Sequence, residues 1–230
     1  EVLLPRRPIC CGRPMISKGL LTEAKALAMQ QLEWLAPYAQ AGMPIIGLEP
    51  SCILTFRDEY PDLLDDPRAA VLAKQSFLID EFLMQEINAG RAKLPFSTTD
   101  DRPMTTDRST ATTSGRRSSV VGRQFLLHGH CHQKALVGTA HALALLRMIP
   151  AAEVREVDSG CCGMAGSFGY EAEHHAISQA IGERALFPAV RALAPAAEVV
   201  AMGTSCRQQI ADGTGRRARH LVELLADALE

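Results

Sequence analysis

The stretch Val199-Val200-Ala201-Met202-Gly203-Thr204-Ser205-Cys206 is a short apolar run that leads directly into a cysteine. The N-terminal half holds a matching stretch, Ile45-Ile46-Gly47-Leu48-Glu49-Pro50-Ser51-Cys52. Short β-branched and aliphatic runs of this kind are typical of core strands in a parallel sheet. Each stretch therefore predicts a strand whose carboxyl end is followed by one cysteine.

A double cysteine precedes both stretches, and this arrangement indicates an internal repeat. Cys161-Cys162-Gly163 and a helical segment come before the second stretch, and Cys10-Cys11-Gly12 and a helical segment come before the first. The double and the single cysteine are separated by 43 residues in the second half and by 40 in the first. The shared order, dipeptide and spacing predict that the chain contains the same unit twice.

The second copy also has a front half, which the first copy lacks. A strand over 124–127 leads to His128-Gly129-His130-Cys131-His132, and a strand over 154–157 leads to Cys161. In the first copy the double cysteine stands close to Glu1, so we expect its front strand, a helix and one cysteine to lie upstream of this residue. The first residues include neither an initiator Met nor an apolar signal region, which favours an internal start over an exported precursor.

Between the predicted strands, apolar side chains recur with helical spacing. The predicted helices cover Ala24 to Leu35, Leu78 to Ile87, Leu136 to Ile149 and Leu221 to Leu229. Strands that alternate with helices predict an α/β fold, with parallel strands and flanking helices in two pseudo-symmetric repeats.

A Ser/Thr-rich segment separates the two copies. Of the 23 residues from Ser97 to Ser119, 12 are Ser or Thr. Such a segment buries too little apolar surface to offset the entropy of ordering it. We therefore expect residues 97–123 to form a flexible linker or loop between a truncated first repeat, 1–96, and a complete second repeat, 124–230.

The charge and the cysteine content exclude several classes of protein. The formal net charge is −2 and the pI is about 6.4, so no broad basic field indicates binding to nucleic acid or anionic lipid. The longest uncharged stretch, Trp34 to Leu48, contains Pro37 and Pro44 and is too short to span a membrane. Seven cysteines, with two adjacent pairs, do not fit a disulfide framework. We expect a cytoplasmic protein whose cysteines are metal ligands or redox groups.

The cysteines are expected to converge, because ligands in parallel α/β sheets bind at the carboxyl ends of the strands. The second repeat predicts one four-thiol site, formed by Cys131, Cys161, Cys162 and Cys206. The first repeat predicts a three-thiol version, formed by Cys10, Cys11 and Cys52. Four thiolates suit either zinc or an iron–sulfur cluster. Two adjacent cysteines bind one small ion only with difficulty, which favours a multi-iron cluster and leaves zinc as the alternative.

Other polar residues beside these cysteines have two interpretations each. His128, His130 and His132 alternate around Cys131, and one of them could be a further ligand or a proton donor to a quinone. Equally, they could be polar residues that close a strand. Lys134 and Arg207 could lower thiolate pKa values or could simply be solvated. The sequence holds no recognisable Ser-His-Asp or paired-carboxylate constellation, so it predicts no catalytic residue.

The order of Cys, Cys-Cys-Gly and then Pro-Ser-Cys or Thr-Ser-Cys resembles the CCG-type cysteine-rich domain found in heterodisulfide reductase and in anaerobic glycerol-3-phosphate dehydrogenase. The segments His128 to Ala135 and Cys161 to Glu171 are most similar to the C-terminal iron–sulfur module of FAD-linked oxidases of D-lactate, glycolate or D-2-hydroxyglutarate. Heterodisulfide reductase has an extra cysteine in each motif, where this chain has Glu49 and Gly203.

The resemblance implies an electron-transfer module. By this likeness all seven cysteines would hold iron–sulfur clusters, of the 4Fe-4S type, that pass electrons to a quinone or another acceptor. FAD, the substrate site and ferredoxin-type clusters would lie in upstream domains or subunits, and the assembly could be peripheral to the inner face of the membrane. The residues alone leave two alternatives open, a zinc-stabilised interaction domain without redox activity and a thiol–disulfide switch.

Overall fold

The structure is a computed structural model, and it describes residues 2–5, 10–96 and 122–229. All of its paired strands are parallel and alternate with helices, which confirms the predicted α/β class. The predicted linker lies almost wholly outside the described residues. In the part of the chain that the structure describes, no helix has the length and apolar character needed to cross a membrane.

The first half folds around a two-stranded sheet, in which β1 (Ile45–Gly47) pairs with β2 (Ser76–Leu78). Its helices are α1 (Arg13–Ser17), α2 (Leu21–Gln40), α3 (Pro50–Arg57), α4 (Glu59–Leu63), α5 (Pro67–Gln75) and α6 (Ile79–Asn88). Pro50 occupies the first position of α3, where a missing N–H breaks no hydrogen bond. The helix can therefore begin directly after β1, and this places Cys52 in its first turn at the carboxyl end of the sheet.

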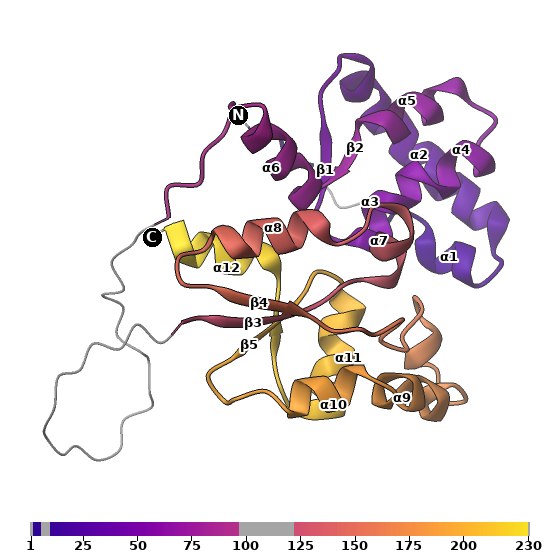
Figure 1. Cartoon of the computed structure of the whole chain (residues 1–230). Helices are drawn as coiled ribbons and strands as arrows, with labels where there is room; N and C mark the ends of the chain where they lie inside the picture. The colour runs from indigo at the N-terminus through magenta and orange to yellow at the C-terminus, as the bar shows by residue number, and fades with distance from the viewer. Residues whose placement is uncertain (1, 6–9, 97–121, 230) are drawn as a thin grey trace, which may run out of the picture.

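The second half folds around a four-stranded sheet with the order β4-β3-β5-β6. These strands are β3 (Gln124–His128), β4 (Glu153–Glu156), β5 (Glu198–Ala201) and β6 (Ala218–Arg219). Its helices are α7 (Cys131–Leu136), α8 (Ala140–Met148), α9 (His175–Glu183), α10 (Leu186–Arg191), α11 (Thr204–Thr214) and α12 (Leu221–Leu229), with a 3-10 turn, η1, over Phe168–Tyr170. Figure 1 shows α8 and α12 on one face of this sheet and α10 and α11 on the other.

The two halves share one order of elements. In the first half β1 is followed by α3, then by the neighbouring strand β2 and by α6. In the second half β5 is followed by α11, then by its neighbour β6 and by α12. The first half differs by inserting α4 and α5 between α3 and β2. Equivalent strand ends therefore carry equivalent cysteines, as the sequence repeat predicts.

Three local predictions need correction. The single helix expected from Leu136 to Ile149 is wrong, because Gly138 adopts a left-handed φ of 83° and separates α7 from α8. The sequence predicts a core strand over 154–157, but β4 is an edge strand and most of its side chains are exposed. Finally, the helix expected from Leu78 begins at Ile79, because Leu78 ends β2.

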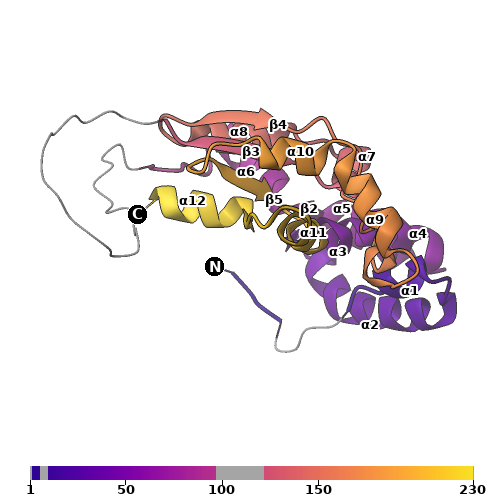
Figure 2. The ribbon, with the colours of Figure 1, turned by 90° about the horizontal axis from the view of Figure 1, so that it is seen from below.

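One buried core joins the two halves. Leu54 and Tyr60 from the first half belong to the same buried cluster as Leu127 and Leu145 from the second. Figure 2 shows α1 beside the loop before α9, where Lys18 forms an ion pair with Glu171. The two sets of cysteines are therefore held in a fixed relation to each other.

A buried carboxyl group adds a polar contact between the halves. Asp80 of α6 accepts a hydrogen bond from Gln133 Nε2 of α7, at 2.9 Å. Burial raises the pKa of this carboxyl to about 6, because the charged form is poorly solvated there. The amide of Gln133 therefore helps to hold the residues just after Cys131 against the first half.

Candidate metal centre

The cysteines of the second repeat meet at the carboxyl end of the four-stranded sheet. Cys131 is the first residue of α7 and Cys206 is the third residue of α11. Cys161 and Cys162 lie in the loop that follows β4. The thiol of Cys131 donates a hydrogen bond to Cys161, and Cys162 donates to both Cys161 and Cys206. The structure thus brings the four predicted sulfur atoms together in one continuous set of contacts.

These contacts split the acidity of the four thiols. The pKa of Cys161 falls to about 2, because Cys131 and Cys162 both donate to its sulfur. The pKa of Cys206 also falls, because Cys162 donates to it and the nearby His128 adds to the effect. The hydrogen bonds that they donate, together with burial, raise the pKa values of Cys131 and Cys162. The site therefore stabilises thiolates, which are the form of cysteine that binds metals.

Backbone N–H groups also face the sulfur of Cys161. The N–H of Gly163 lies 3.3 Å from this sulfur and donates to it. Gly163 can adopt this turn because it lacks a side chain: its φ is 104°, and a Cβ would overlap the carbonyl oxygen of Ser178. Hydrogen bonds of this kind stabilise thiolates and metal-bound sulfur.

The first repeat builds a smaller version of the same turn. The N–H of Gly12, with a φ of 86°, donates to Cys10 Sγ at 3.5 Å. Cys52 donates to Cys11, which lowers the pKa of Cys11 to about 7. The hydroxyl of Tyr60 donates to the carbonyl oxygen of Cys11 at 2.9 Å and fixes the backbone of the turn. The three predicted thiols of this repeat also lie together, although Cys10 and Cys52 are exposed.

A histidine completes the set of donors in the second repeat. His128 is the last residue of β3 and only 1% of its surface is exposed. One of its ring nitrogens lies within 4.8 Å of the sulfur atoms of Cys162 and Cys206. Its Nδ1 is 3.0 Å from Ser159 Oγ, whereas its Nε2 is buried without a hydrogen-bond partner among the described residues. A buried thiolate-rich site with an unpartnered imidazole nitrogen fits a bound metal or iron–sulfur cluster.

The other two histidines have different partners. His130 Nε2 lies 3.1 Å from Ser51 Oγ in the first half, and its Nδ1 accepts the N–H of His132 at 3.2 Å. His132 Nε2 lies 3.7 Å from a carboxylate oxygen of Asp58. Both side chains therefore link the repeats.

Lys134 and Arg207 are held by backbone carbonyl groups. The ammonium group of Lys134 donates to the carbonyl oxygen of Ser159. The guanidinium group of Arg207 donates to the carbonyl oxygens of Ala201, at 3.1 Å, and Met202, at 2.6 Å. Both cations thus fix the loops that carry the site, a role that neither sequence-based interpretation included.

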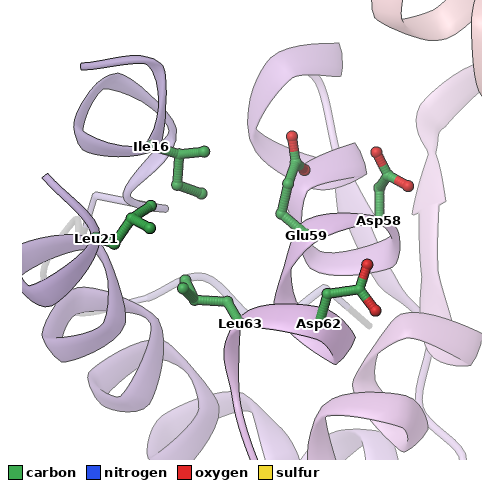
Figure 3. A pocket seen from close by; sticks show the side chains of 6 residues that line it. All are labelled: Ile16, Leu21, Asp58, Glu59, Asp62 and Leu63. Carbon is green, nitrogen blue, oxygen red and sulfur yellow. The ribbon is translucent and has the colours of Figure 1, made fainter. Parts of the chain in front are cut away.

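A hollow lined by carboxylates lies in the first half, away from the gathered sulfur atoms. Figure 3 shows Asp58, Glu59 and Asp62 on one side of it, opposite three apolar side chains. Arg13 forms an ion pair with Glu59. This cation balances part of the negative charge, so the hollow adds no donor to the cysteine sites.

Glu49 connects the two cysteine sites directly. Its carboxylate accepts the N–H of Ser51 at 3.3 Å, at the start of α3, and the N–H of Thr204 at 2.7 Å, at the start of α11. Cys52 and Cys206 lie in the first turns of these two helices. One side chain therefore caps both cysteine-bearing helices, a role that the sequence could not reveal because the two helix starts are far apart along the chain.

Replacing Glu49 by Gln is expected to lower the free energy of unfolding by about 2 kcal/mol, because a neutral amide has one acceptor oxygen for two N–H groups and no charge at two helix N-termini. Urea titration of the variant against the parent protein measures the change. Glu173→Gln removes an exposed carboxylate and serves as the charge-matched control. An unchanged midpoint in Glu49→Gln would contradict the bridging role.

Comparison with known proteins places these motifs among oxidoreductases. The chain is 30% identical to the C-type subunit of anaerobic glycerol-3-phosphate dehydrogenase from Escherichia coli K12, over 96% of this chain and 49% of that protein. It is 30% identical to the D-2-hydroxyglutarate dehydrogenase of the same strain, over 100% of this chain and 20% of that enzyme. It is 26% identical to lactate utilization protein A of Bacillus velezensis, over 73% of this chain and 61% of that protein.

The match covers nearly all of this chain but only part of each relative, about half of the glycerol-3-phosphate dehydrogenase subunit and a fifth of the D-2-hydroxyglutarate dehydrogenase. No family model matches the chain. No solved structure matches it either. The chain is thus a homologue of dehydrogenase proteins that include a subunit of anaerobic glycerol-3-phosphate dehydrogenase and D-2-hydroxyglutarate dehydrogenase, in agreement with its resemblance to the CCG-type cysteine-rich module.

Proposed function

We propose that this chain is the iron–sulfur-binding electron-transfer module of a flavin-dependent oxidoreductase that acts on a 2-hydroxy acid or on glycerol 3-phosphate. The observation that carries the proposal is the continuous contact between four sulfur atoms at one sheet edge. The relatives support an oxidoreductase role, because two of the three kinds are named as dehydrogenases.

The proposed ligands in the second repeat are Cys131, Cys161, Cys162 and Cys206, and those in the first repeat are Cys10, Cys11 and Cys52. Adjacent cysteines suit a cluster better than a single ion, because a cluster offers separate metal atoms to neighbouring thiolates. When bound, an iron–sulfur cluster would supply one-electron transfer. The chain would hold it, exclude water with the buried Cys162 and Cys206, and stabilise its sulfur atoms with the N–H of Gly163.

The partners in this proposal are upstream flavoprotein and ferredoxin-type domains or subunits, which deliver electrons, and a quinone or another acceptor, which receives them. Since the matches cover only parts of the relatives, substrate and acceptor belong to the whole assembly. All seven cysteines are free, which supports a location in the reducing cytoplasm.

Metal analysis of the chain purified without oxygen tests the proposal. We expect iron and acid-labile sulfide in similar amounts, with visible absorbance that dithionite bleaches and an electron paramagnetic resonance signal in the reduced or oxidised protein. Stoichiometric zinc without sulfide or visible absorbance would overturn the proposal and favour a zinc-stabilised interaction domain. The three close donors of His128, Cys162 and Cys206 are the observation that favours this second candidate.

A further inference from the structure

His128 has the surroundings of a metal ligand. It is one of the most deeply buried polar side chains of the second repeat, with 1% of its surface exposed. Its Nε2 has no hydrogen-bond partner in the described part of the protein. A buried imidazole nitrogen without a partner loses its hydration without compensation, which is unfavourable unless another group binds it. The sulfur atoms of Cys162 and Cys206 face the same space, within 4.8 Å of a ring nitrogen.

The imidazole ring is also oriented from behind. Its Nδ1 lies 3.0 Å from the hydroxyl oxygen of Ser159, and Ser159 is itself 6% exposed. Lys134 holds the backbone of Ser159 through its carbonyl oxygen. If Nδ1–H donates to Ser159, Nε2 carries the lone pair that a metal requires. Metal-binding histidines in proteins are commonly oriented by such a contact at the second nitrogen.

The donors divide into two groups across the site. His128, Cys162 and Cys206 lie within 4.8 Å of one another. Cys131 contacts Cys161, which in turn contacts Cys162. Two adjacent cysteines therefore face different groups of donors, as expected when they bind different metal atoms of one cluster.

We propose that His128 is a nitrogen ligand of the metal centre in the second repeat, beside Cys162 and Cys206. The inference rests on the proposed metal centre but not on whether it contains iron or zinc. Exchange of a thiolate for an imidazole makes a cluster less negative and raises its reduction potential. The second-repeat centre is accordingly easier to reduce than an all-thiolate centre of the same type.

Pulsed electron paramagnetic resonance of protein labelled with 15N-histidine tests the ligand. We expect a nitrogen coupling from a bound imidazole in the parent protein and its loss in His128→Cys, with iron and sulfide retained and a lower reduction potential in a dithionite titration. His130→Gln and His132→Gln are the matched controls, because these neighbours have partners in the first half, and both should keep the coupling. An iron–sulfur protein without any histidine coupling would overturn the inference.

A second readout separates this inference from the proposed function. If the purified protein contains zinc and no sulfide, the iron–sulfur proposal fails, and zinc X-ray absorption then tests His128. One nitrogen at about 2.0 Å beside sulfur at about 2.3 Å should appear in the parent protein and disappear in His128→Cys. Zinc with sulfur ligands alone would overturn the histidine ligand, and a protein that binds neither iron nor zinc would overturn both proposals.

Discussion

Replacing Cys206 by Ser is expected to remove the metal centre of the second repeat while leaving the rest of the chain folded. Cys206 is buried, its pKa is lowered by the hydrogen bond from Cys162, and its sulfur lies close to His128. A serine hydroxyl is not a thiolate and is a poor ligand for iron or zinc at neutral pH. We expect metal affinity at this centre to fall at least about 100-fold, the upper end of what loss of a mere supporting contact costs.

The functional consequence of Cys206→Ser follows from the proposed division of labour. In the intact oxidoreductase, substrate should still reduce the flavin, since the chain supplies thiolates but no recognisable acid–base constellation. Electron delivery to the acceptor should be blocked. Stopped-flow bleaching of the flavin and steady-state reduction of the acceptor measure the two steps separately.

The controls for this experiment come from the same motif. Ser205→Ala changes the neighbouring residue and should leave metal content and both rates unchanged. Cys52→Ser changes the equivalent position of the first repeat and should affect only the first centre. Loss of flavin reduction in a normally folded Cys206→Ser protein would place the module in the substrate site. Unchanged rates in both steps would indicate a structural role.

The sequence predicted the architecture because the signals for it are local. Apolar runs at Ile45-Ile46 and Val199-Val200 form strands, and each cysteine-bearing helix begins a few residues later. The strands of β2 and β6 were not predicted, because elements of three and two residues leave no periodicity to recognise. The break at Gly138 was also not predicted, since a left-handed glycine inside an apolar segment has no distinct local signal.

The site divides in the same way. The convergence of Cys131, Cys161, Cys162 and Cys206 followed from the rule that ligands gather at strand ends. Which of the three neighbouring histidines turns toward the sulfur atoms did not follow, because it depends on Ser159 from the next strand end. The double cap of Glu49 depends on how the two repeats pack, and packing between distant segments is not written in either motif.

Replacing Gly163 by Ala is expected to be far more damaging than the equivalent change at Gly12. Both glycines follow a double cysteine and both have positive φ, 104° and 86°. A Cβ at Gly163 would overlap the backbone oxygen of Ser178, whereas one at Gly12 would lie 3.3 Å from the oxygen of Ala24. Strain alone should cost Gly12→Ala about 1–2 kcal/mol, and the added backbone overlap should bring Gly163→Ala to about 3–5 kcal/mol.

The larger change should also reach the metal centre, because the N–H of Gly163 donates to Cys161 and the amide of Gln209 donates to the carbonyl oxygen of Cys162, at 3.0 Å, and to that of Ser178, at 3.1 Å. Moving Ser178 away from a new Cβ would pull on the turn that presents both sulfur atoms. Urea unfolding and metal content measured on the two variants side by side separate the effects. Gly163→Ala should lose both stability and metal from the second centre, whereas Gly12→Ala should keep that centre. Equal losses in the two variants would show that the tight approach to Ser178 does not shape the site.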